Sequence, residues 1–336
     1  MTQQKRIVVT GGAGFIGSAL IWKLNQQGIS NILVVDAFDK SEKWKNLAPL
    51  HFNDYQEKDS FIKDITAGKY NNTIDAVFHL GACSSTTETD ARYLALNNFE
   101  YTKQLAIFCS TNNIRFIYAS SAATYGDGSN GYTDEESQMH TLCPLNMYAL
   151  SKKMFDIWAF DNGLLSTIVG LKYFNVFGPN EYHKADMRSM ICKGYQQIIE
   201  TGKIKLFKSY HTEYADGEQV RDFIYVKDAV AMTLHFYAHR SLSGIYNIGS
   251  AATTSWNTLA AALFAALNKK TNIRYIDMPE ILRKKYQYHT QANIQKLRAA
   301  GYHNEITPIA DAIRDYVQNY LIPGNVLNAE KQKPSK

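Results

Sequence analysis

The sequence has few cysteines, no long apolar run and no dense block of one charge. Its four cysteines, Cys83, Cys109, Cys143 and Cys192, form no C-x-x-C pair, so we expect reduced thiols in the cytoplasm rather than disulfides or a metal site. No apolar stretch approaches the roughly 18 residues of a membrane span, and the first strand pattern starts too early for a signal peptide. The net charge of +5 is spread over 336 residues, which argues against nucleic acid as a partner.

What the sequence does contain is a regular alternation of short apolar runs and longer helical patterns. Five runs are β-branched and almost wholly apolar, which is typical of strands covered on both faces. They are residues 6–10, 31–36, 76–80, 115–120 and 166–173. Helical patterns lie between them, at 14–27, 97–112 and 148–160. Strand–helix–strand repetition predicts an α/β protein with a doubly wound parallel sheet of the Rossmann type.

Beyond the fifth run the pattern loosens, which indicates a second, smaller α/β domain. We expect a dinucleotide-binding domain over residues 1–177, to which the chain returns near 223–250. The substrate domain would then consist of 178–222 and 251–322. The tail, 323–336, offers nothing to bury and is predicted to be disordered.

The stretch "VVTGGAGFIGS" places Gly11, Gly14 and Gly17 directly after the first strand pattern. Glycines at this spacing allow a tight turn, a close approach of the backbone to a pyrophosphate, and close helix–strand packing. The helix that follows offers the free N–H groups of its N-terminus to an anion. Asp36 ends the second strand pattern about 20 residues further on, where an acid that binds a ribose is expected. The stretch therefore predicts a dinucleotide site.

These residues leave the choice between NAD and NADP open. Asp36 favours the free 2′-hydroxyl of NAD and would repel a 2′-phosphate. Lys43 and Lys58 follow in loop regions where a lysine could bind the 2′-phosphate of NADP. Isolated lysines are more often solvated surface charge, so they do not decide the matter.

A second group of residues predicts proton transfer. Tyr148 and Lys152 are four residues apart at the start of a helical pattern, so they share one face. A free phenol loses its proton at about pH 10, and we expect the lysine ammonium to lower the pKa of Tyr148. Ser120 and Ser121 end a strand pattern, where a hydroxyl points into the crevice above a parallel sheet. Together these groups could move a proton off a carbinol while its hydride passes to a nicotinamide.

Through "TGGAGFIGS", "SSAATYG", "YALSK" and "LKYFNVFGPN", the chain resembles the extended short-chain dehydrogenase/reductase superfamily. Within it, "HLGACSSTTETD", "FNVFGPNEYHK", "RDFIYVKD" and "KYQYHTQAN" resemble segments of the ADP-L-glycero-D-manno-heptose 6-epimerases. The resemblance runs from residue 6 to about residue 322. It implies a homo-oligomeric isomerase that uses NADP and interconverts the C6 epimers of an ADP-heptose for the lipopolysaccharide inner core.

The resemblance also gives a role to the loop "GPNEYHKAD", residues 178–186. Transient oxidation makes a planar ketone, which presents its other face before it is reduced again. Because the oxygen then lies on the other side of the carbon, a second acid/base group is needed. The resemblance assigns that role to Lys184, with Tyr148 as its counterpart and Lys152 and Ser121 beside it.

The resemblance implies two further sets of contacts. For the cofactor these are Gly11, Gly14, Phe15, Ile16, Gly17, Asp36, Ala37, Lys43, Lys58, Leu80, Gly81, Ala82, Cys83, Ser84, Asn97, Lys152, Val176 and Lys184. For the substrate they are Ser121, Asn175, Asp186, Lys193, Phe207, Arg221 and Tyr286. The guanidinium of Arg221 could form bidentate hydrogen bonds with phosphate oxygens, or it could form an ion pair with Asp222 or Glu218.

Departures from the family pattern leave the exact sugar nucleotide open. Ala37 replaces a usual asparagine, Lys193 a histidine and Asp186 a small hydroxyl residue, and the loop 208–220 is longer. A UDP-sugar 4-epimerase is the nearest alternative, but its reaction does not call for Lys184. A 4,6-dehydratase would carry Asp-Glu where "AATYG" offers no carboxylate. A non-catalytic NADP-sensing Rossmann module would have no use for the proton-transfer residues.

Overall fold

The computed structural model describes residues 5–283 and 286–328. Its centre is a seven-stranded sheet in the order β11-β6-β5-β4-β1-β2-β3, in which every pair of neighbours is parallel. The strands are β1 Arg6–Thr10, β2 Ile32–Asp36, β3 Asp54–Glu57, β4 Ile74–His79, β5 Arg115–Ser121, β6 Val169–Tyr173 and β11 Gly244–Ile248. The predicted doubly wound parallel sheet is thereby confirmed.

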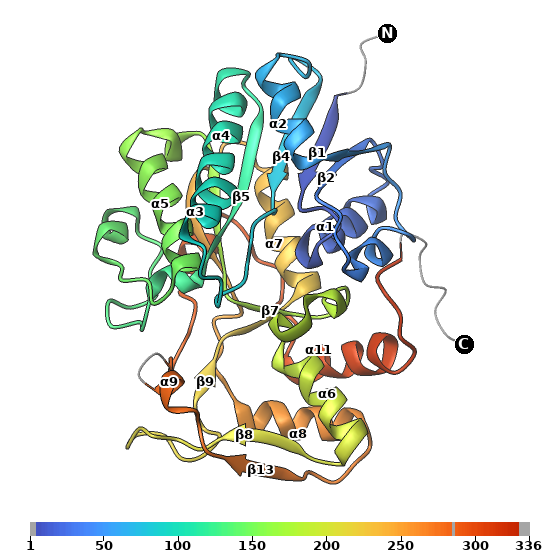
Figure 1. The fold of residues 1–336 in the computed structure, drawn as a ribbon, viewed down its shortest axis with the longest axis vertical. Helices are drawn as coiled ribbons and strands as arrows, with labels where there is room; N and C mark the ends of the chain where they lie inside the picture. The colour runs from blue at the N-terminus through green and yellow to red at the C-terminus, as the bar shows by residue number, and fades with distance from the viewer. Residues whose placement is uncertain (1–4, 284–285, 329–336) are drawn as a thin grey trace.

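Helices cover both faces of this sheet (Figure 1). On one face lie α1 Phe15–Gln26 and α7 Val226–Ala238, and on the other α2 Lys58–Thr66, α4 Tyr101–Thr111 and α5 Met147–Asp161. Successive side chains of a strand point to opposite faces, so Ile7 and Val9 enter one core and Val8 the other. Strands buried on both sides explain why the sequence runs are almost continuously apolar.

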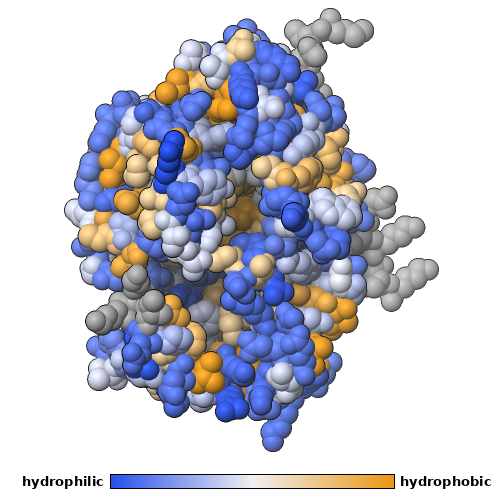
Figure 2. Space-filling model, in the orientation of Figure 1, coloured by the Kyte–Doolittle hydropathy of each residue, from blue (hydrophilic) through white to orange (hydrophobic). Residues whose placement is uncertain are grey.

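A smaller part packs against the end of the sheet and lies at the bottom of Figure 1. It contains α6 Met190–Thr201, β8 Ile204–Phe207, α8 Trp256–Ala266, β13 Ile273–Ile276 and α11 Ile309–Tyr316, with β8 and β13 parallel. Its apolar side chains, among them Ile198, Leu263 and Ile313, belong to the same core as α1 and α7. The face drawn in Figure 2 is hollowed between the two parts. The exact domain boundaries stay a prediction.

The prediction that the tail buries nothing is wrong at its beginning. Leu327 is buried, and its N–H donates to the side chain of Asn180 at 2.9 Å. The carbonyl of Asn325 accepts a hydrogen bond from the hydroxyl of Tyr182 at 2.8 Å. Residues 329–336 lie outside the described residues. Within the described ranges, no helix combines the length and the apolar character that crossing a membrane requires.

Candidate active site

A cavity of about 620 Å³ lies at the carboxyl ends of the parallel strands. Ligands bind at this edge of open α/β sheets, next to the point where the strand order reverses, here between β1 and β4. Most of the residues expected to contact the cofactor or to transfer protons line it. They are Gly11, Gly14, Phe15, Ile16, Gly17, Asp36, Lys43, Leu80, Gly81, Ala82, Cys83, Ser84, Ser121, Tyr148, Lys152, Val176 and Lys184. The predicted substrate residue Asn175 lines the cavity as well.

The glycine loop leaves no room for side chains. Gly11 has a φ of +67°, and a Cβ there would lie 2.6 Å from the backbone of Gly81. A Cβ on Gly17 would lie 2.1 Å from the carbonyl oxygen of Gly11. Gly14 precedes α1 without a side-chain cap, so no side chain covers the N–H groups of the first turn. This arrangement fits the pyrophosphate of a dinucleotide.

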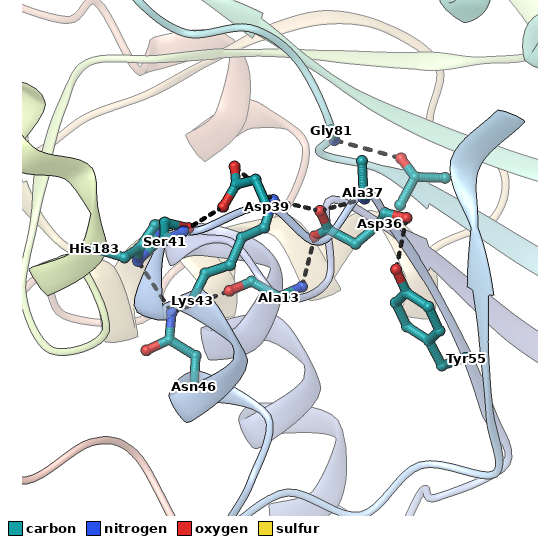
Figure 3. Close-up of polar contacts among 11 residues, drawn as sticks. Ala13, Asp36, Ala37, Asp39, Ser41, Lys43, Asn46, Tyr55, Gly81 and His183 are labelled. Carbon is teal, nitrogen blue, oxygen red and sulfur yellow. Dashed lines mark hydrogen bonds and ion pairs between the residues drawn. The ribbon is translucent and has the colours of Figure 1, made fainter.

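Asp36 is held firmly at the end of β2 (Figure 3). Its Oδ2 accepts from the N–H of Ala13 at 2.8 Å. Its Oδ1 accepts from the N–H of Ala37 at 2.8 Å and from Nζ of Lys43 at 3.0 Å. The predicted acid and the predicted lysine therefore form an ion pair, and Lys43 holds its charge next to the place where a ribose is expected.

Three of the predicted cofactor residues do not line the cavity. Ala37 follows Asp36 without contributing to the wall. Lys58 is half-buried and pairs with Asp59 at 2.6 Å. Asn97 donates to the side-chain oxygen of Asn98 at 3.0 Å. Their direct contact with a cofactor stays a prediction.

Two buried polar residues that the sequence analysis missed hold the loop after β4. Asn98 accepts from the N–H of Cys83 at 2.8 Å and donates to the Cys83 carbonyl at 2.9 Å. His79 lies between the hydroxyls of Thr10 and Thr102, at 2.6 and 2.7 Å. Burial holds the pKa of His79 well below its usual range, so it acts as a neutral structural group. No motif could reveal these residues, because only the fold brings their partners together.

The proton-transfer residues converge as expected. Tyr148 and Lys152 lie in the first turns of α5, which Asn146 caps by accepting the N–H of Ala149 at 2.9 Å. Lys152 donates to the carbonyl oxygen of Ala119 at 2.9 Å, and burial lowers its pKa to about 8.

The expected lowering of the Tyr148 pKa is not seen. Burial raises the pKa of Tyr148, and the hydrogen bond with the Ser121 hydroxyl opposes this shift only in part. The prediction was wrong because it weighed the lysine charge and omitted the desolvation of the phenol. Tyr148 is therefore protonated at neutral pH, which suits a proton donor.

Lys184 lines the same cavity but lies on a separate segment of the chain. It belongs to a short 3₁₀ segment, Tyr182–Met187, and its Nζ lies 5.3 Å from the centroid of the Phe15 ring. Burial lowers its pKa, and the charge of Glu181 opposes that shift. A lysine with a lowered pKa can exchange a proton near neutrality more readily than a solvated one.

A second cavity, of about 540 Å³, adjoins the first and shares Asn175, Val176 and Met187 with it. The predicted substrate residues Lys193, Phe207 and Tyr286 line it. Asp186 is exposed, and its backbone carbonyl accepts from Lys193 at 3.2 Å. Its side chain is not part of either wall.

Arg221 lies between aromatic rings beside the second cavity. Its guanidinium carbon lies 5.1 Å from the ring centroid of Tyr286 and 5.8 Å from that of Trp256. Trp256 was not singled out by the sequence, and its Nε1 donates to the Tyr286 hydroxyl at 2.9 Å. Arg221 is 8% exposed, and burial lowers its pKa.

The two ion pairs considered for Arg221 do not form. Asp222 is buried and accepts from the N–H groups of Ser250, Ala251 and Ala292 at 2.7 to 2.9 Å. Glu218 accepts from the side chain of Asn257. Within residues 5–283 and 286–328, no carboxylate forms an ion pair with Arg221, so its guanidinium is available to an anionic ligand.

Comparisons with known proteins agree with this site. Residues 7–249 match the model of the NAD dependent epimerase/dehydratase family. The chain belongs to this family and is an epimerase.

Its relatives include an ADP-L-glycero-D-manno-heptose-6-epimerase from Nitratidesulfovibrio vulgaris, 51% identical over 94% of this chain and 97% of that protein. Another ADP-L-glycero-D-manno-heptose-6-epimerase, from Fusobacterium nucleatum, is 48% identical over 94% of this chain and 98% of that protein. The Helicobacter pylori ADP-L-glycero-D-manno-heptose-6-epimerase structure has a TM-score of 0.79 at 26% identity, over 94% of this chain and 96% of that one. Within its family, the chain belongs to the ADP-L-glycero-D-manno-heptose-6-epimerases.

Proposed function

We propose that the protein interconverts ADP-D-glycero-β-D-manno-heptose and ADP-L-glycero-β-D-manno-heptose by inverting C6. The observation that carries this proposal is that Tyr148, on helix α5, and Lys184, on the loop after β7 Asn175–Phe177, line one cavity. The names of relatives about half identical over almost the whole chain support the substrate. The product would supply heptose for the lipopolysaccharide inner core.

The cofactor is proposed to be NADP. When bound, the nicotinamide would supply reversible hydride transfer at C6. The glycine loop would hold the pyrophosphate, and Asp36 and Lys43 would lie at the adenosine ribose. Lys43 supports NADP, because it brings a positive charge to the carboxylate that would otherwise repel a 2′-phosphate.

Tyr148 and Lys184 each exchange a proton with the C6 oxygen, one for each epimer. The Ser121 hydroxyl lines the same cavity as Tyr148 and helps to place the sugar oxygen. Lys152 is fixed by the Ala119 carbonyl below the same cavity, where its positive charge favours loss of the phenolic proton during the reaction. These four groups are the proposed catalytic residues.

The nucleotide end of the substrate is proposed to occupy the second cavity. Arg221 would bind the diphosphate, because its largely desolvated guanidinium, which donates one hydrogen bond to the carbonyl of Val220 and has no carboxylate partner among the described residues, gains most from a bidentate anion. Tyr286, Phe207 and Lys193 would surround it, and Asn175, shared by both cavities, marks the boundary with the sugar. A homo-oligomer in the cytoplasm remains part of the proposal and rests on the sequence analysis alone.

The test is to incubate the purified protein with ADP-D-glycero-D-manno-heptose and to follow the configuration at C6 by NMR. Conversion with NADP bound, and none in protein stripped of nicotinamide, is expected. A UDP-sugar offered in parallel should not be inverted at C4. Inversion of the UDP-sugar alone would replace the proposal by a 4-epimerase function. Binding affinities of NADP and NAD to wild-type protein and Lys43→Ala test the cofactor, since only NADP should lose affinity.

A further inference from the structure

The loop that carries Lys184 is closed by a single carboxylate, that of Glu181. Glu181 is fully buried. It accepts from the N–H of Gly178 at 3.3 Å, where the loop begins. It also accepts from the N–H and the hydroxyl of Ser189, where the loop ends, the latter at 2.7 Å. A side chain that binds both ends of a loop restricts the backbone between them.

The same carboxylate connects the loop to two helices of the smaller part. The hydroxyl of Tyr316, the last residue of α11, donates to Glu181 at 3.1 Å. Ser189 caps α6, because its hydroxyl accepts from the N–H of Cys192 at 3.2 Å. Glu181 therefore sets where Lys184 lies relative to the elements that border the second cavity.

The backbone next to Lys184 needs such support. The N–H of Lys184 donates to the carbonyl of Glu181 at 3.0 Å. The next residue, Ala185, has a φ of +45° and a ψ of −121°. Residues other than glycine rarely adopt this conformation, and it persists where surrounding contacts impose it. The bonds of Glu181 to Gly178 and Ser189 lie on either side of this strained position.

Glu181 also acts on Lys184 through its charge. Burial lowers the pKa of Lys184 and raises that of Glu181, and the charge of each residue opposes the shift of the other. The loop carries four further titratable groups, Tyr182, His183, Asp186 and Arg188. Burial raises the pKa of Tyr182, and burial together with the charges of Lys184 and Lys43 lowers that of His183 to about 4, so both side chains stay neutral at neutral pH. Asp186 is exposed, and the guanidinium of Arg188 donates to the carbonyl of Ala185. Phe15 faces Lys184 from α1 and carries no charge.

We propose that Glu181 is a positioning residue for Lys184, which fixes the loop 178–189 and places a buried carboxylate in the same loop as the amine. This inference rests on the proposed function, in which Lys184 serves one of the two epimers. Gly178, Ser189 and Tyr316 provide the bonds through which Glu181 acts.

The first experiment compares Glu181→Gln with Tyr316→Phe, which removes one hydrogen bond and keeps the charge. Oxidation of each C6 epimer is followed separately in single turnovers by the nicotinamide absorbance. We expect Glu181→Gln to slow the oxidation of one epimer by about tenfold or more and to leave the other almost unchanged. Tyr316→Phe should slow the oxidation of that same epimer by less than about threefold. Equal slowing of both epimers by Glu181→Gln would overturn the inference.

The second experiment needs no cofactor or substrate. With lysines labelled at the ε-carbon, the pKa of Lys184 is measured by NMR, its signal being assigned by its loss in Lys184→Ala. Glu181→Gln should lower this pKa, and Tyr316→Phe should leave it unchanged. An unchanged pKa in Glu181→Gln would overturn the role of the charge.

Lys184→Ala separates this inference from the proposed function. If Lys184→Ala oxidises both epimers like the wild type, the proposed role of Lys184 fails. If Lys184→Ala no longer oxidises one epimer and Glu181→Gln oxidises both at the wild-type rate, the inference alone fails. Should Glu181→Gln not fold, Ser189→Ala takes its place, because it removes a hydrogen bond and keeps the charge. If Ser189→Ala oxidises only one epimer more slowly, the inference is supported. If it slows the oxidation of both epimers equally, the inference is overturned.

Discussion

Lys172 and Asp156 form an ion pair in which Nζ lies 3.3 Å from Oδ2 and both side chains are almost wholly buried. Lys172 lies on β6, and Asp156 lies one turn beyond Lys152 on α5. The carboxylate also accepts from the hydroxyls of Tyr118 and Ser120, at 2.9 and 2.6 Å. The carboxylate thus joins the helix that carries the proposed catalytic residue Lys152 to two strands of the sheet, β5 and β6.

Asp156→Asn should destabilise the protein strongly. It leaves Lys172 buried without its carboxylate, and breaking a buried ion pair typically costs about 3–5 kcal/mol. Asp161→Asn is the matched control, since Asp161 ends the same helix and pairs with His140 at an exposed position. That change should cost less than about 1 kcal/mol. Urea unfolding of the two variants provides the comparison, and equal free energies of unfolding would contradict the importance of the buried pair.

The sequence predicted the sheet well because its strands are buried on both sides. A run such as 115–120, whose central residues are apolar at successive positions, is typical of a strand covered on both faces. Strand β3 was missed, because "DYQE" at the edge of the sheet carries no apolar run. The burial of Leu327 was missed as well, since its partner Asn180 lies 147 residues away in the chain.

The candidate site was predicted as a set of residues, and its electrostatics were not. Tyr148, Lys152 and Lys184, which motifs singled out, line one cavity, because the fold places the carboxyl ends of the strands and the segments that follow them at one edge, and their roles stay a prediction. Buried groups such as Glu181 and Asn98 depend on partners from several elements, so spacing in the sequence does not reveal them. The pKa of Tyr148 depends on desolvation, which a linear pattern does not contain.

Tyr148→Phe should abolish most of the epimerisation and leave the fold intact. The change removes only the hydroxyl that exchanges the proton, and loss of a general acid or base typically costs about 10²- to 10⁴-fold in kcat. NADP affinity should be unchanged, as measured by fluorescence titration. Tyr275→Phe, at a partly exposed tyrosine whose hydroxyl bonds to Asn257, is the control and should keep wild-type turnover. Undiminished turnover in Tyr148→Phe would remove the residue from the mechanism.

Arg221→Met should weaken binding of the nucleotide diphosphate. Charge-assisted hydrogen bonds contribute about 1.5–3 kcal/mol, so we expect KM for the sugar nucleotide to rise by about tenfold to a hundredfold. The value of kcat should change much less, because Arg221 packs against Tyr286 and Trp256, which line the second cavity, rather than against the proposed proton-transfer residues. Arg240→Met removes an exposed arginine that pairs with Asp75 and should leave KM unchanged. A KM in Arg221→Met close to the wild-type value would exclude a diphosphate contact.

Epimerisation should fall as pH rises through about 8, the pKa of Lys152. Burial lowers this pKa from the usual value of a lysine, so the ammonium is present below about pH 8 and is lost above it. The pKa of Tyr148 is raised, so its own ionisation lies at higher pH and does not produce this limb. A profile of kcat/KM against pH gives the measurement. Lys153→Met, a change at the adjacent residue whose amine binds the carbonyls of His140 and Leu142, should keep the alkaline limb. Lys152→Met should show low activity and no fall of kcat/KM near pH 8. If the fall near pH 8 is unaltered in that variant, it arises from the titration of another group.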